Sequence, residues 1–160
     1  MIRILRIDRN HPLYAQETDL RERGLLVPIG RDFAWYESAY GDAEAQYEHF
    51  VAVIDHPTGE KVVGSVCLLP HHPGHGIGKL TQMVVDPQRR REGIGRKLVT
   101  AFERRATGEL GITELYCHAQ LAAVPFYERL GWEIEGDEFE EAASGTARWS
   151  SGPIETDSPG

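Results

Sequence analysis

Five basic residues surround two glycines at a point where a strand-like sequence gives way to a helical one. The segment from Gln82 to Leu98 reads QMVVDPQRRREGIGRKL, and its cations are Arg89, Arg90, Arg91, Arg96 and Lys97. The first backbone N–H groups of a helix have no partner within the helix, and the helix dipole is positive there. Gly93 and Gly95 allow the backbone to approach a bound group closely. The pattern therefore predicts an anion site suited to phosphate.

Two common phosphate motifs do not match this segment or its neighbourhood. A Walker A loop requires G-x-x-x-x-G-K-[ST], whereas the nearest candidate ends in Gly78-Lys79-Leu80 and has Pro73 in place of the first glycine. A dinucleotide fingerprint starting at Gly93 requires a third glycine where Leu98 stands. The anion site is therefore predicted to belong to a different class.

The charge of the chain is uneven. Its 160 residues carry 17 Lys and Arg against 25 Asp and Glu, for a formal net charge of −8. Residues 89–97 alone carry +4, which leaves −12 on the remainder. Because nucleic-acid binding needs an extended basic face, the acidic balance argues against a nucleic-acid partner, while the local basic segment favours a small phosphate-bearing ligand.

Length and composition predict one soluble domain. Hydrophobic residues make up 41% and charged residues 26% of the chain, as in ordinary globular proteins. No apolar run approaches the ~20 residues that span a bilayer, and the charged N-terminus has no signal-peptide core. Two cysteines make no disulfide framework, which favours the cytoplasm. We expect a single domain over 1–149, no membrane association, and a flexible Ser/Pro/Gly-rich tail over 150–160.

Hydrophobic periodicity and turn residues place the elements that must position the basic segment. Alternating or apolar runs predict strands, and a four-residue apolar repeat predicts helices. The expected strands are 2–7, 49–55, 61–69, 79–85, 112–118, 132–136 and 146–149, and the expected helices are 13–25, 93–107 and 122–130. This order is typical of a layered α/β domain with helices packed on a mixed sheet.

A second segment makes the pattern more specific. Arg90 to Gly95 fits [Q/R]-x-x-G-x-[G/A], and Leu115 to Trp132 reads LYCHAQLAAVPFYERLGW. In this order and spacing, the two segments resemble the GCN5-related N-acetyltransferase (GNAT) family, and the HAQ…A…FY…GW form resembles its ElaA-like branch. The resemblance covers about residues 1–139. Phe139 to Glu141 begin the closing segment typical of the branch, but Ala142 to Trp149 do not continue it.

The resemblance implies a fold and a cofactor. It implies a mixed, mostly antiparallel sheet of six to seven strands flanked by about four helices. It implies acetyl-CoA as the acyl donor, with the pantetheine arm along Met83, Val84 and Val85, and it implies no metal. The other implied cofactor-binding residues are Arg90, Arg91, Glu92, Gly93, Ile94, Gly95, Arg96 and Gln120.

The resemblance also implies an activity: transfer of an acetyl group to a primary amine of a small molecule or peptide by direct attack. Tyr127 is then the candidate general acid for the departing thiolate, although the same residue also suits an aromatic core position. A different function with the same ligand is a non-catalytic acetyl-CoA sensor or assembly module. The resemblance is compatible with a homodimer.

No motif identifies the base that would deprotonate the amine. Glu48, His118 and a water molecule held by Gln82 all remain candidates. The histidines of the loop HHPGH, His71, His72 and His75, have no acidic or cysteine ligand close in sequence and predict a flexible loop. Cys67 and Cys117 are expected to be buried strand thiols rather than nucleophiles.

Overall fold

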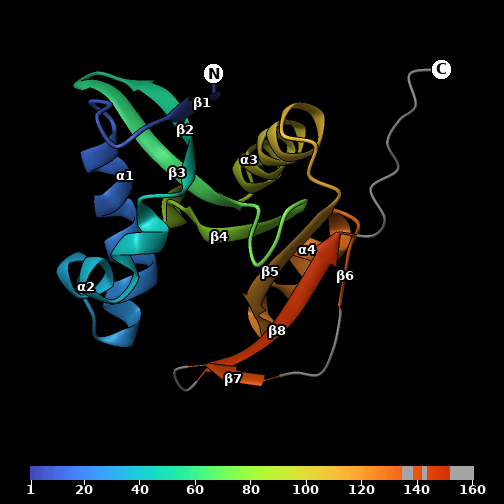
Figure 1. Ribbon diagram of the computed structural model, residues 1–160. Helices are drawn as coiled ribbons and strands as arrows, with labels where there is room; N and C mark the ends of the chain where they lie inside the picture. The colour runs from blue at the N-terminus through green and yellow to red at the C-terminus, as the bar shows by residue number, and fades with distance from the viewer. Residues whose placement is uncertain (135–138, 142–143, 152–160) are drawn as a thin grey trace.

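The computed structural model describes residues 1–134, 139–141 and 144–151. A single sheet runs through the molecule in the order β1-β2-β3-β4-β5-β8-β6, with β7 paired to β8 (Figure 1). The strands are β1 (Arg3–Ile7), β2 (Glu48–His56), β3 (Gly59–Pro70), β4 (Ile77–Val85), β5 (Glu114–Gln120), β6 (Trp132–Ile134), β7 (Phe139–Glu141) and β8 (Ser144–Ser151).

All neighbouring strands are antiparallel except β4 and β5, which are parallel. The predicted mixed, mostly antiparallel sheet is therefore confirmed, but the described residues form eight strands rather than six or seven. The three-residue β7 accounts for the additional strand. β8 reaches Ser151, so it extends into the segment predicted as a tail, and residues 152–160 lie outside the described part. Among the described residues, no helix has the length and apolar character needed to cross a membrane.

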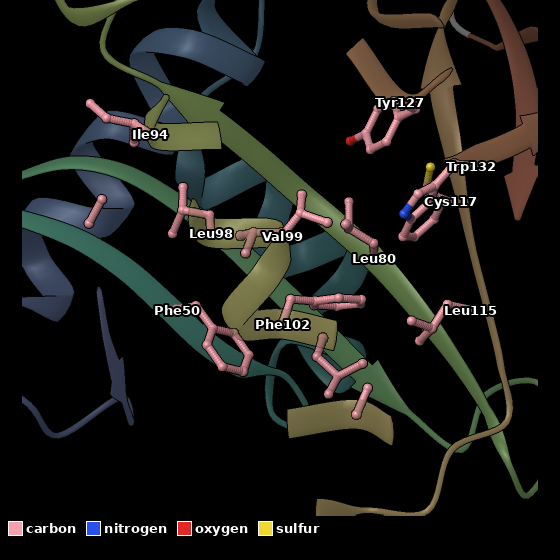
Figure 2. Close-up of a cluster of buried hydrophobic side chains, with 14 of the residues drawn as sticks. Phe50, Leu80, Ile94, Leu98, Val99, Phe102, Leu115, Cys117, Tyr127 and Trp132 are labelled. Carbon is pink, nitrogen blue, oxygen red and sulfur yellow. The ribbon is translucent and has the colours of Figure 1, made fainter. Parts of the chain in front are cut away.

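Helices cover the two faces of the sheet. They are α1 (Tyr14–Arg21), α2 (Phe33–Glu44), α3 (Ile94–Glu103) and α4 (Val124–Arg129). Figure 1 shows α1 and α2 together, well separated from α3. α3 buries Ile94, Leu98, Val99 and Phe102 against strand residues such as Phe50 and Leu80 (Figure 2). A separate cluster beneath α1 includes Leu20, Val51 and Val84.

Two predicted helices end in π-helical turns, and one helix was not predicted. The expected helix 13–25 divides into α1 and a π-helical turn, Glu22–Leu26, and the expected helix 93–107 divides into α3 and Arg104–Glu109. The polar sequence of α2 gave no clear periodicity. Its start is set by Asp32, whose carboxylate accepts a 2.8 Å hydrogen bond from the Trp35 backbone N–H, the usual capping interaction at a helix N-terminus.

β4 contains one extra residue relative to β3. Val84 lies opposite Ser65 and Thr81 lies opposite Cys67, so two residues of β4 face the single residue between them on β3. Gln82, at this bulge, has a left-handed backbone with φ of 55°. In a regular strand, Leu80 and Val84 would share a face, but Leu80 belongs to the α3 core and Val84 to the α1 core. The alternation of side chains along β4 is therefore shifted by one residue at the bulge, so that the even-numbered side chains face α3 before it and α1 after it.

The turn after α1 packs closely on the strand beyond this bulge. A Cβ added at Gly24 would overlap with Val84 Cγ2. The absence of a side chain at residue 24 therefore lets the π-helical turn rest directly on β4.

We expect Gly24→Ala to lower the free energy of unfolding by about 1–3 kcal/mol, because the added methyl group overpacks this contact. Gly41→Ala is the matched control, since a Cβ there meets nothing within 4 Å and α2 gains a better helix former. Urea unfolding measures both variants. Equal effects of the two substitutions would contradict the proposed close contact.

Candidate functional site

β4 and β5 separate after a short paired region. Their parallel pairing runs from Ile77 opposite Glu114 to Leu80 opposite Cys117. β4 then continues to Val85 and β5 to Gln120, and Figure 1 shows the two strands diverging. The edge of β4 that faces β5 beyond Leu80 therefore has no strand partner among the described residues. Such an edge presents backbone donors and acceptors to an extended ligand.

The three β4 residues assigned to cofactor binding lie on this open stretch. Val84 faces the α1 core, whereas Met83 and Val85 pack against the α3 core. The other edge of this stretch remains paired in the sheet, since Val84 and Val85 lie opposite Ser65 and Gly64 of β3. Gln120 ends β5 on the other side of the gap, and its side chain lies outside what the structure describes.

The predicted anion loop leads directly from β4 into α3. Arg91 and Gly93 both have left-handed backbones, with φ of 74° and 75°. The first intrahelical bond joins the Lys97 N–H to the Gly93 carbonyl at 3.1 Å. No side chain caps this helix, and its first turn holds no acidic residue. The preceding N–H groups are therefore available to a ligand, and the dipole favours an anion there.

Most of the predicted cations point into solvent around this loop. Arg89 contacts Glu92 at 3.5 Å. Arg90, Arg91, Arg96 and Lys97 are exposed, and no ion pair found among the described residues involves them. The local positive charge that the sequence predicts is therefore not neutralised within this part of the chain.

Gly95 also serves a packing role that the sequence did not reveal. A Cβ at this position would lie 2.9 Å from Cε1 and 3.0 Å from Cζ of Phe126. The glycine thus allows the first turn of α3 to lie against α4, which carries Tyr127. At Gly93 a Cβ would meet nothing within 4 Å, so the left-handed backbone is the reason for glycine there.

Tyr127 is buried, with 4% of its surface exposed. It lies between Phe126 and Trp132, with ring centroids 5.0 and 5.5 Å away, and Cys117 is a further neighbour (Figure 2). Burial and this neighbour raise the pKa of Tyr127 well above its usual range, so the phenol stays protonated. Burial also raises the pKa of Cys117 to about 12, which is unsuited to a thiolate nucleophile.

Comparison with known proteins decides the family. The sequence profile of the Acetyltransferase (GNAT) family matches residues 13–132. A Bacillus subtilis (strain 168) protein named as an acetyltransferase is 32% identical over 113 residues, which are 70% of this chain and 68% of that protein. The chain belongs to the GNAT acetyltransferase family. It is accordingly an acyl-CoA-dependent N-acyltransferase.

Solved structures share the fold of this GNAT protein. Escherichia coli ElaA superposes with a TM-score of 0.75 at 15% identity, over 95% of this chain and 100% of that one. An aminoglycoside 6'-N-acetyltransferase complexed with coenzyme A superposes with a TM-score of 0.73 at 20% identity, over 93% and 96% of the two chains. At these identities the comparison shows a common fold.

The three candidate bases of this acyltransferase lie in different environments. Glu48 is bound to Arg105 at 2.7 Å and to Arg6 at 3.7 Å, on the β1 side of the sheet. The Gln82 carbonyl accepts a hydrogen bond from Arg21. His118 is exposed, one residue beyond the last β4–β5 pair, and strand alternation places it on the face opposite Cys117.

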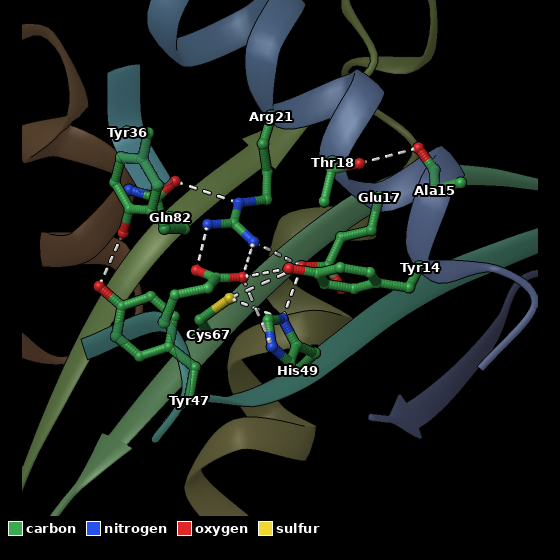
Figure 3. Close-up of polar contacts among 11 residues, drawn as sticks. Tyr14, Ala15, Glu17, Thr18, Arg21, Tyr36, Tyr47, His49, Cys67 and Gln82 are labelled. Carbon is green, nitrogen blue, oxygen red and sulfur yellow. Dashed lines mark hydrogen bonds and ion pairs between the residues drawn. The ribbon is translucent and has the colours of Figure 1, made fainter. Parts of the chain in front are cut away.

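A buried ionic cluster lies between the sheet and α1 (Figure 3). Fully buried Arg21 donates from Nη1 to Glu17 at 3.0 Å and to Glu44 at 2.8 Å, and from Nη2 to Glu44 at 2.7 Å. Its Nε donates to Gln82 Oε1 at 3.1 Å. Sequence reasoning missed this cluster, because only the four-residue spacing of Glu17 and Arg21 signals it and such pairs usually lie on exposed helix faces.

Three potential metal ligands lie within the same cluster. Ligand atoms of Glu17, His49 and Cys67 lie within 4.8 Å of one another, and all three residues are buried. Oε2 of Glu17 already accepts a hydrogen bond from Arg21 and lies 2.7 Å from His49 Nδ1. The guanidinium therefore supplies the positive charge beside this carboxylate.

The raised pKa of Cys117 predicts a specific dependence of stability on pH. The thiol titrates near 9.0 when unfolded and near 12 when folded, so the unfolded chain loses this proton first and stability falls as pH rises from 9 towards 12. We expect the stability advantage of the wild type over Cys117→Ala to shrink by about 1.4 kcal/mol per pH unit in this window. Urea unfolding from pH 8 to 11 measures it, and a constant difference would contradict the assignment.

Proposed function

We propose that this chain transfers an acetyl group from acetyl-CoA to a primary amine of a small molecule or peptide by direct attack, with Tyr127 as the general acid. The observation that carries the proposal is the end of β4–β5 pairing at Leu80 and Cys117 while both strands continue. An open strand edge leads from there to an uncapped helix N-terminus surrounded by unneutralised arginines.

The residues around the gap fit coenzyme A. The backbone N–H groups from Arg91 to Arg96 and the exposed cations suit a diphosphate, and the free edge of Met83 to Val85 suits the amide-containing pantetheine arm. When bound, acetyl-CoA supplies an activated acyl thioester. A backbone N–H on β4 would hydrogen-bond the thioester oxygen as negative charge develops, and one such donor typically contributes ~10²–10³ in rate.

Tyr127 is suited to donate a proton to the departing sulfur. Its raised pKa, which burial causes, keeps the phenol protonated. It comes from α4, next to the first turn of α3 through the contact between Phe126 and Gly95. The helix that binds the diphosphate and the helix that carries the acid are thus held together.

His118 is the residue that we assign to receive the proton of the acceptor amine. Its imidazole is exposed at the gap, on the opposite face from Cys117 and Tyr127, so acid and base approach from different sides. Histidine is the side chain that most often serves as a general base. Glu48 is held in ion pairs elsewhere, and the Gln82 oxygen is already an acceptor for Arg21.

We expect Tyr127→Phe to lower turnover at least ~10-fold while the dissociation constant for coenzyme A changes little, because the phenol acts on the leaving group and not in binding. Release of free thiol from acetyl-CoA, with a panel of primary amines, measures turnover, and calorimetry measures binding.

Tyr40→Phe is the control, since Tyr40 is 50% exposed on α2. Unchanged turnover in Tyr127→Phe would remove Tyr127 from the mechanism. Binding of acetyl-CoA by the wild type with no thiol release for any amine would instead favour the non-catalytic sensor.

A further inference from the structure

The bulge in β4 stands next to the open edge and has an unfavourable backbone. Gln82 adopts φ of 55°, and a left-handed backbone is unfavourable for a residue that carries a side chain. Glycine is the usual residue where such a conformation is needed, and here the chain has glutamine. A contact of the Gln82 side chain must therefore offset the backbone cost.

Arg21 provides that contact and also sets the direction of the Gln82 amide. A guanidinium carries only donors, so the atom that faces Arg21 Nε must be the Gln82 carbonyl oxygen, at 3.1 Å. The amide nitrogen is then turned away from the guanidinium (Figure 3). The oxygen and nitrogen of a glutamine amide are often hard to tell apart, but a partner that can only donate identifies the oxygen.

Arg21 is itself immobilised. Glu44 binds it through both carboxylate oxygens, at 2.8 and 2.7 Å, and Glu17 binds it at 3.0 Å. The rings of Phe33 and Tyr36 lie 5.1 and 5.4 Å from its guanidinium carbon. Its side chain is completely buried, so the group that binds Gln82 has a fixed position relative to α1 and α2.

A contribution to folding stability alone does not explain this buried cluster of charges. Removing charges from water is costly, and buried ion pairs are often no more stabilising than well-packed apolar residues. This cluster also leaves Glu17 Oε1 and His49 Nε2 without a hydrogen-bond partner. A role in fixing the backbone of the bulge at Gln82 gives these buried charges beside β4 a purpose.

We propose that Arg21 is a positioning residue, which holds the left-handed bulge at Gln82 and thereby keeps Met83 to Val85 open to coenzyme A. Gly24, in the turn that follows α1, contacts Val84 two residues beyond the bulge. The α1 segment thus restrains β4 on both sides of Met83. This inference rests on the proposed function, since it assigns the cofactor to that edge.

The test uses two variants of Gln82 that leave Arg21 and its carboxylates in place. Gln82→Glu retains an oxygen acceptor for Arg21, whereas Gln82→Leu removes it at similar size. Calorimetry at a temperature far below the unfolding midpoint should show the dissociation constant for coenzyme A raised at least tenfold in the leucine variant and within threefold of wild type in the glutamate variant. Equal affinity of all three proteins, or equal loss in both variants, would overturn the proposal.

A ligand-independent measurement separates this inference from the proposed function. The Cα chemical shift of residue 82 reports its φ, and we expect the left-handed value in the wild type and Gln82→Glu but not in Gln82→Leu. If the wild type binds no coenzyme A, the proposed function fails, and the shift still decides whether Arg21 holds the bulge.

Arg23→Met serves as the control for Arg21→Met, since Arg23 lies two residues away in an exposed 2.9 Å ion pair with Asp19. We expect coenzyme A affinity to be unchanged in the Arg23 variant. In Arg21→Met the residue-82 shift should be altered if the variant folds. A wild-type shift in folded Arg21→Met would contradict the assignment.

Discussion

One additional residue in β4 governs the arrangement of the site. Without the bulge at Gln82, Leu80 and Val84 would face the same layer, and the strand could not serve the α3 core at one end and the α1 core at the other. The change also coincides with the end of pairing to β5 at Leu80. At these few residues of β4 the pairing with β5 ends and the side chains exchange the layers that they face. The strand edge beyond this point is left open to a ligand.

The remaining elements hold this edge from both faces. On one face the buried Arg21 hydrogen-bonds Gln82, and Gly24 packs closely against Val84. On the other face, the start of α3 lies against Phe126 of α4 because residue 95 is glycine. The loop proposed to bind diphosphate, the open edge and the candidate acid are thereby fixed relative to one another, and fixed geometry of this kind is what electrostatic stabilisation of a transition state requires.

The sequence predicted the parts with strong local signals. The basic glycine loop, the apolar stripe of α3 and the strand before it all appear where expected, because periodicity and glycine placement are local properties. α2 was missed, since its polar residues carry no stripe. The Arg21 cluster and the bulge were also missed. The contact of Arg21 with Gln82 joins residues far apart in the sequence, and the bulge is defined by the pairing of β4 with β3, so both exist only in the folded chain. Gly95 was interpreted from the ligand alone, whereas its tight contact with Phe126 depends on tertiary packing.

Hydrogen–deuterium exchange with and without coenzyme A tests the central claim most directly, because it locates the ligand on the backbone without knowledge of the acceptor. Binding at the open edge should slow exchange of the amides in Met83–Val85 and in residues 91–96, while β1 and β2, on the far side of β3, remain unchanged. Coenzyme A that binds without slowing exchange in either segment would contradict the assignment of the β4–β5 gap as the cofactor site.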